Sequence, residues 1–165
     1  MNGNAWILAA AVLLASACAH LATDGLLPGV ASEADVRARL GEPGMSWSEP
    51  DGGKLLEYSG QPNGTFCRMI VIGPDGKLRE IRDAFTAENF ARVLPGLGED
   101  EVRRLLGAPQ EIVRFDLKPD EEVWSWLVGE TSEKYEYFNV YFGRDRRLLR
   151  SNRSVIYKAS GPGME

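Results

Sequence analysis

The sequence predicts an α+β protein made of two tandem α(α)-β-β-β units, with helices packed on an antiparallel sheet. Residues 36–43 recur 66 positions later (102 − 36) as residues 102–109, with Val, Arg, Leu, Gly and Pro unchanged at five of eight positions. Each copy is followed by extended apolar runs that turn-forming residues separate. Residues 72–78 and 142–148 match again near the end of each unit. Such a repeat indicates one supersecondary unit used twice.

The first copy of the repeated stretch is typical of a short amphipathic helix that ends abruptly. Ser32 and Asp35 stand where a capping box would satisfy the free N–H groups of the first turn. Val36 and Leu40 are four residues apart and share one helical face. A glycine at position 41 and a proline at position 43 then stop the helix. The repeated Gly and Pro therefore have an architectural explanation.

The second copy predicts the same helix with the same stop. Residues 99–101 are acidic, which suits the positive end of a helix dipole, and Val102, Leu105 and Leu106 form an apolar stripe. Residues 86–94 are expected to form a preceding helix. The expected strands cover residues 54–59, 65–72 and 77–82 in the first unit, and 111–117, 122–128, 135–142 and 148–158 in the second.

The first residues form a segment of a different kind. Residues 1–18 carry no charged side chain, and residues 5–15 are an almost unbroken apolar run, which is too short to span a bilayer but suits a secretory signal. The end of this segment, Leu14-Ala15-Ser16-Ala17-Cys18, resembles the lipobox of bacterial lipoproteins, which implies lipid attachment to Cys18. Ala15 and Ala17 also satisfy an ordinary signal-peptidase site, and release of a soluble periplasmic protein stays open.

These patterns divide the chain into five parts. Residues 1–17 are expected to be a lipoprotein signal peptide, 18–25 a lipidated tether, 26–83 the first unit, 84–158 the second unit and 159–165 a tail. The chain has two cysteines, Cys18 and Cys67. If Cys18 carries lipid, Cys67 is a single thiol, and its apolar neighbours predict that it is buried. A Cys18–Cys67 disulfide is the alternative if Cys18 is not acylated.

The sequence gives no positive sign of catalysis. Its one histidine, His20, falls in the expected tether, so common zinc sets and Ser-His or Cys-His pairs are missing. Phosphate-binding, nucleophile-elbow and Cys-x-x-Cys motifs are missing too. The net charge of −5 argues against nucleic acid. We therefore expect a noncatalytic protein without cofactor, metal or nucleic-acid partner.

Aromatic residues on the expected strands are the candidate partner-binding residues. Side chains two positions apart on a strand point to the same face, which groups Trp124 with Trp126. In the next strand, Phe138, Val140 and Phe142 are expected to pack on the helices, which leaves the tyrosines on the opposite face. Burial of both tryptophans between the units is the alternative. The candidates are Trp47, Tyr58, Trp124, Trp126, Tyr135, Tyr137 and Tyr141.

The helix-stop motifs, the strands that follow them and the lipobox together resemble the SmpA/OmlA (BamE-like) family of outer-membrane lipoproteins. The resemblance implies a lipid-anchored protein on the periplasmic face of the outer membrane, with envelope or outer-membrane assembly proteins as partners. The tandem arrangement resembles that of beta-lactamase inhibitor proteins. It implies an alternative function, inhibition of a periplasmic or secreted hydrolase such as a beta-lactamase or protease.

Overall fold

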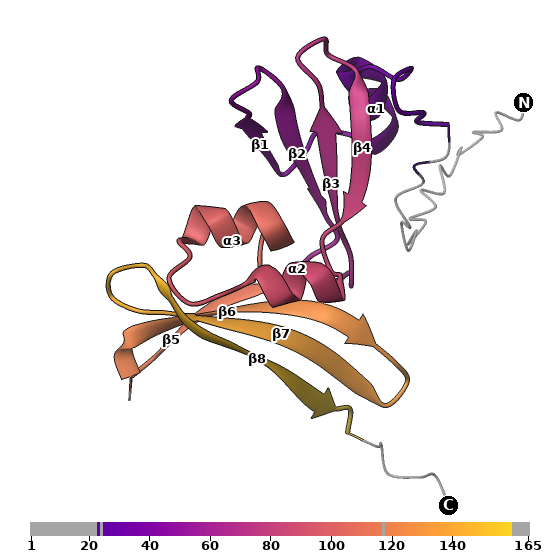
Figure 1. The fold of residues 1–165 in the computed structure, drawn as a ribbon. Coiled ribbons are helices and arrows are strands. Elements are labelled where there is room, and N and C mark those ends of the chain that lie inside the picture. Colours follow the sequence, from indigo (N-terminus) through magenta and orange to yellow (C-terminus); the bar gives the residue numbers. More distant parts are fainter. Residues whose placement is uncertain (1–22, 24, 117, 160–165) are drawn as a thin grey trace, which may run out of the picture.

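A computed structural model describes residues 23, 25–116 and 118–159 of the chain. It shows a mixed helix and sheet fold with two four-stranded antiparallel sheets, in the orders β1-β2-β3-β4 and β5-β6-β7-β8 (Figure 1). Each strand therefore pairs with its neighbour in sequence. None of the helices in the described ranges is long and apolar enough to cross a membrane.

Apart from one additional strand, the elements follow the predicted order. The first half contains α1 (Glu33–Leu40), β1 (Met45–Ser48), β2 (Lys54–Ser59), β3 (Cys67–Ile72) and β4 (Leu78–Asp83). The second half contains α2 (Ala87–Arg92), α3 (Glu99–Leu106), β5 (Glu111–Phe115), β6 (Lys118–Glu130), β7 (Lys134–Phe142) and β8 (Leu148–Tyr157).

The expectation of three strands in the first unit was wrong, because β1 is a fourth. This strand has only four residues and follows directly on the helix stop, so its sequence resembles a loop. It gains its structure from pairing along β2, from Met45 opposite Glu57 to Ser48 opposite Lys54. The four strands expected in the second half are confirmed, although β6 begins at Lys118 instead of residue 122.

The first sheet uses one face to pack on α1. Ser32 and Asp35 form the expected capping box, and the helix ends at Gly41, whose φ is 82°. The side chain of Val36 is fully buried and packs against apolar residues of three strands: Leu56, Tyr58, Ile70, Ile72 and Leu78. The opposite face of this sheet carries Trp47, Leu55, Glu57, Cys67 and Met69, because side chains alternate along each strand.

The second sheet buries the expected Phe and Val side chains against α2 and α3. Val102 and Leu106 of α3 and Phe90 of α2 face a core that contains Trp124, Trp126, Phe138, Val140, Phe142 and Leu148. Phe90 and Phe138 lie 4.5 Å apart between ring centroids. Both helices lie on the same side of this sheet in Figure 1, between it and the first sheet.

Equivalent contacts recur in the two halves. The hydroxyl of Tyr58 in β2 donates to the carbonyl of Gly41 at 3.0 Å, and the indole N–H of Trp126 in β6 donates to the carbonyl of Gly107 at 3.1 Å. Ser32 forms an isolated antiparallel β-bridge with Lys77, and Gly98 forms the equivalent β-bridge with Arg147. In each half, therefore, an aromatic donor on the second strand holds the glycine that ends the preceding helix.

Candidate functional site

The second sheet has a face that no helix among the described residues covers. Strand alternation places Tyr135, Tyr137, Asn139 and Tyr141 of β7 on the side opposite Phe138 and Val140. Their β8 neighbours on this side include Asn152 and Ser154. We call this surface the tyrosine face, defined by Tyr135, Tyr137, Asn139, Tyr141, Asn152 and Ser154. Figure 1 shows α2 and α3 on the other side of the sheet.

A hydrogen-bond network fixes the centre of the tyrosine face. The buried amide of Asn139 donates to Asn152 Oδ1 and Ser154 Oγ, both at 2.9 Å, and Asn152 donates to the Tyr141 hydroxyl at 3.2 Å. These bonds limit the rotamers that the side chains can adopt. A surface ordered in this way loses less conformational entropy when it binds a partner.

An arginine and a glutamate extend the ordered region. The guanidinium of Arg150 lies 3.9 Å from the centroid of the Tyr141 ring and donates to both carboxylate oxygens of Glu121, at 3.1 and 2.7 Å. These hydrogen bonds lower the pKa of Glu121 and raise that of Arg150. The Arg150 cation is thus held over an aromatic ring, a favourable cation–π geometry.

A shallow hollow of about 410 Å³ lies on the same face. Its lining includes Glu111, Ser125, Tyr137, Ser154 and Ile156 from the second sheet and Pro62 from the first half. Burial is the main cause, and the nearby Tyr135 the second cause, of a raised pKa at Tyr137. Its hydroxyl therefore stays protonated at neutral pH.

The Pro62 rim of this hollow is held by the residue before it. The side chain of Gln61 donates from Nε2 to the Leu127 carbonyl at 2.8 Å and accepts from the Leu127 N–H at 3.4 Å. The β2–β3 connection of the first half is thereby attached to β6 of the second. The hollow therefore depends on both halves of the chain.

The other four candidates are not on this surface. Trp47, Tyr58, Trp124 and Trp126 are buried, and Trp126 is fully inaccessible. Their polar atoms are also engaged: Trp47 donates to Asp100 at 2.8 Å and Trp124 to Glu122 at 2.6 Å, while Tyr58 and Trp126 bond the helix-stop glycines. These four side chains hold the fold together, and three of the seven candidates, Tyr135, Tyr137 and Tyr141, meet on one open face.

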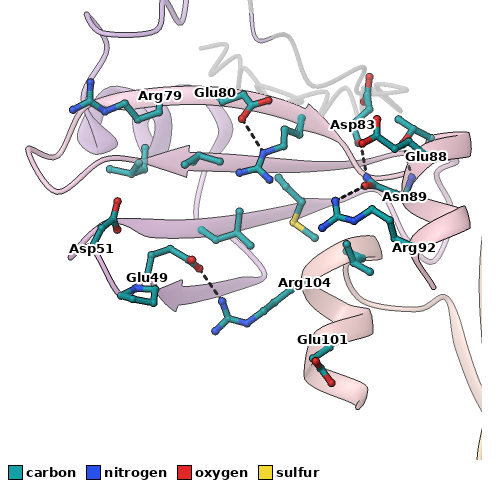
Figure 2. Close-up of a pocket in the computed structure, with 18 of the residues that line it drawn as sticks. Glu49, Asp51, Arg79, Glu80, Asp83, Glu88, Asn89, Arg92, Glu101 and Arg104 are labelled. Atoms are coloured by element: carbon teal, nitrogen blue, oxygen red, sulfur yellow. Dashed lines mark hydrogen bonds and ion pairs between the residues drawn. The ribbon is translucent and has the colours of Figure 1, made fainter. Parts of the chain in front are cut away.

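A second concave region, which we call the inter-sheet cleft, lies between the first sheet and helices α2 and α3. It has a volume of about 1160 Å³ and a floor that includes Leu55, Met69 and Val71. Charged side chains from both halves line it, and all the residues labelled in Figure 2 except Asn89 are charged. No sequence pattern predicts this cleft, because its walls come from segments far apart in the chain.

The charges of the inter-sheet cleft largely neutralise one another. Arg104 of α3 pairs with Glu49 at 2.8 Å, and Arg82 pairs with Glu80 at 3.0 Å (Figure 2). The hydrogen bond from Arg104 is the main cause, and the hydrogen bond from Trp47 the second cause, of a lowered pKa at Asp100. The same bond between Arg104 and Asp100 raises the pKa of Arg104. Both groups are thus held in their charged forms, which suits a structural ion pair better than proton transfer.

Cys67 is a free thiol at the contact between the halves. Its side chain is 1% exposed, and burial, then the nearby Glu57 carboxylate, raises its pKa to about 12. Cys18, the predicted lipid attachment site, lies outside the described residues. Among the residues that the structure places, no group of three or more His, Cys, Asp or Glu side chains could hold a metal ion.

We expect Cys67 to resist iodoacetamide in the folded chain at about pH 8, because the thiolate is the reactive form and the thiol is shielded. Its folded pKa of about 12 lies above the ordinary value of 9.0. The protonated thiol therefore makes its full contribution to the stability of the fold below about pH 9, and this contribution is lost as the pH rises toward 12. Peptide mapping after labelling with and without urea measures the first effect. Labelling of Cys67 as fast in the native chain as in urea would contradict its burial.

Comparisons with known proteins do not assign a family. No protein-family model matches the chain, and no curated protein matches it. One solved structure is similar over 81% of this chain and 84% of its own: a DUF4309 family protein (YjgB) from Bacillus subtilis subsp. subtilis str. 168. The identity is 18% and the TM-score 0.30, which does not establish a shared fold.

Proposed function

We propose that this protein is a noncatalytic lipoprotein of the bacterial envelope that binds a protein partner through the tyrosine face. The observation that carries the proposal is the ordered tyrosine face of β7 and β8, which no helix among the described residues covers. Tyrosine offers a large contact area with few rotatable bonds, and it is enriched among residues that dominate binding energy. The asparagine network fixes the position of Tyr141, and Pro62 and Ile156 add apolar contact at the hollow.

We further propose that the two sheets belong to two copies of one unit, similar to that of the SmpA/OmlA family. The repeated helix-stop sequence and the equivalent contacts of Tyr58 with Gly41 and of Trp126 with Gly107 support this proposal. On this interpretation the first copy lost its open sheet face to α3 of the second. The open face of the second copy then remains as the binding surface.

The lipobox-like sequence supports attachment of the chain to the outer membrane, on its periplasmic face, through lipid on Cys18. Mass spectrometry of the mature N-terminus is expected to find acylated Cys18, and Cys18→Ala is expected to move the chain from the membrane to the soluble fraction. An unmodified residue 18 in the mature chain would overturn this part of the proposal.

Site-specific photo-crosslinking tests the binding surface. A photoreactive amino acid at Ser125, in the hollow, is expected to crosslink an envelope protein in cells, while the same amino acid at the exposed Val30 of the first half is not. Tyr137→Ala is expected to reduce the Ser125 crosslink about tenfold, the effect of losing roughly 1.4 kcal/mol of binding energy.

The identity of the crosslinked protein separates the two functions. An outer-membrane assembly or envelope-integrity component agrees with the proposed function, while a hydrolase that the chain inhibits would favour the inhibitor alternative. Equal crosslinking from Ser125 and Val30, or a Ser125 crosslink unaffected by Tyr137→Ala, would contradict binding at the tyrosine face.

A further inference from the structure

The outer edge of β8 differs from the other sheet edges of this protein. β8 has ten residues and, among the described strands, pairs only with β7. The other three edge strands, β1, β4 and β5, have four, six and five residues. Native proteins usually protect edge strands by keeping them short, by placing charged side chains on them, or by interrupting them with proline or a bulge. β8 is long, contains no proline, and its bulge lies only at its start, opposite Tyr141 and Phe142.

The backbone of β8 has hydrogen-bonding groups that point away from β7. The N–H of Lys158 donates to the Glu133 carbonyl at 2.8 Å, which fixes the alternation of paired and unpaired residues along the strand. The amides of Arg153, Val155 and Tyr157 then face outward. At the other end, Gly96 and Leu97 already bond the outward-facing groups of Leu148, each at 2.8 Å. With respect to the described residues, the free part of the edge therefore runs from about Arg150 to Tyr157.

The side chains along this free edge include exposed apolar and basic groups and no acid. Val155, Ile156 and Tyr157 are 45%, 56% and 74% exposed, and they alternate between the two faces of the sheet. Residues 146–159 contain no acid in a chain whose net charge is −5. Arg150 and Lys158 pair with Glu121 and Glu130 of β6 at 2.7 and 2.6 Å, whereas Arg153 pairs with no acid among the described residues. Arg153 lies 4.8 Å from the Phe90 ring centroid, so its cation is held beside the edge.

We infer that the β8 edge binds an extended, acidic segment of a partner protein as a fifth strand of the second sheet. This inference rests on the proposed function and specifies how the partner is held. The outward amides supply main-chain hydrogen bonds, as in other cases of strand addition, and the guanidinium of Arg153, which no described acid pairs, favours carboxylates. The added strand would lie directly beside Asn152 and Ser154 and so extend the tyrosine face.

The charge of the edge argues against a second copy of this chain as the occupant. If two β8 strands paired across a two-fold axis near Arg153, the two Arg153 side chains, which pair with no acid among the described residues, would lie close together. An acidic strand removes this repulsion. The apolar side chains of Val155 and Ile156 would pack on alternate side chains of the added segment.

The test uses the full chain in detergent and a synthetic peptide that alternates glutamate and valine, about eight residues long to match the free edge. Val155→Pro removes one outward N–H without breaking a bond to β7, and proline is tolerated at such edge positions. Val155→Thr keeps the N–H and a β-branched side chain. Calorimetry is expected to show that Val155→Pro weakens peptide binding about tenfold or more, whereas Val155→Thr changes it less than about twofold.

Two further measurements test the charge preference of the edge and the place where the peptide binds. A peptide of alternating lysine and valine is expected to bind at least about tenfold more weakly than the acidic peptide. Amide hydrogen exchange is expected to slow at Arg153, Val155 and Tyr157 when the acidic peptide is added. Circular dichroism of both Val155 variants confirms that the fold is retained.

Several outcomes would overturn the inference: no binding of the acidic peptide, equal binding by the Pro and Thr variants, self-association that Val155→Pro abolishes, or binding of anionic phospholipid vesicles alone. These outcomes are distinguishable from failure of the proposed function. The Ser125 crosslink reports on the tyrosine face and does not require an added strand at β8.

Discussion

Arg103→Ala is expected to lower the free energy of unfolding by about 3–5 kcal/mol, because it leaves the carboxylate of Glu57 buried without its cation. Glu57 is 1% exposed and lies in β2, on the face of the first sheet that points toward α3. Arg103 comes from α3 of the second half and donates from Nε to Oε2 at 3.1 Å and from Nη2 to Oε1 at 3.4 Å.

The size of this effect comes from the isolated charge more than from the strength of the pair. A buried ion pair contributes little compared with apolar residues of similar volume, since both charges were dehydrated on folding. Removing one partner, however, leaves the whole dehydration penalty of the other. Because Glu57 and Arg103 belong to different halves, the loss is also expected to weaken the contact between the two sheets.

Urea unfolding of the full chain measures the effect. Arg79→Ala is the matched control, because Arg79 pairs with Asp75 at an exposed site, where such pairs contribute about 0–1 kcal/mol. The double variant Arg103→Leu/Glu57→Leu is expected to recover at least about half of the loss, because no buried charge remains. Equal effects of Arg103→Ala and Arg79→Ala would show that the Glu57 carboxylate is hydrated.

Local sequence signals predicted most of the secondary structure. The capping box at Ser32, the glycine stops and the alternation of β7 each involve residues close in sequence, so the pattern alone specifies the geometry. β1 was missed because only its pairing with β2 makes it a strand. A four-residue segment has too few side chains to show an alternating pattern.

The candidate site was predictable only in part. Alternation separated the tyrosines from the Phe and Val side chains, but it could not tell which aromatic faces the helices would cover. Trp126 and Tyr58 bond glycine carbonyls 19 and 17 residues before them, and Trp47 reaches Asp100 at a separation of 53. These partners meet only through packing, and the 46-residue separation of Arg103 and Glu57 has the same origin. No local pattern encodes such pairs.

The two glycines that end α1 and α3 have the same backbone conformation but different surroundings, so alanine is expected to have different effects at the two positions. Gly41 and Gly107 end α1 and α3 with φ of 82° and 77° and ψ of −164° and −170°, a region that is essentially restricted to glycine. Gly41→Ala is therefore expected to destabilise the chain by about 1–3 kcal/mol. A new Cβ at position 41 meets no atom within 4 Å, so backbone strain is the whole effect.

Gly107→Ala is expected to destabilise the chain by about 1–3 kcal/mol more than Gly41→Ala, because the new methyl group would overlap a buried atom. A Cβ at position 107 would collide with Sγ of Cys67, on β3 of the other half, and that thiol is buried. Thermal and urea unfolding of the two variants gives the difference directly.

Cys67→Ala in the Gly107→Ala background separates the two contributions. Removing Sγ is expected to recover the excess loss and leave only the backbone strain that both glycines share, whereas Cys67→Ala is not expected to rescue Gly41→Ala. Equal destabilisation by the two alanines would mean that α3 does not press on β3. The result therefore tests whether the second helix stop, besides ending its own helix, also sets the distance between the two sheets.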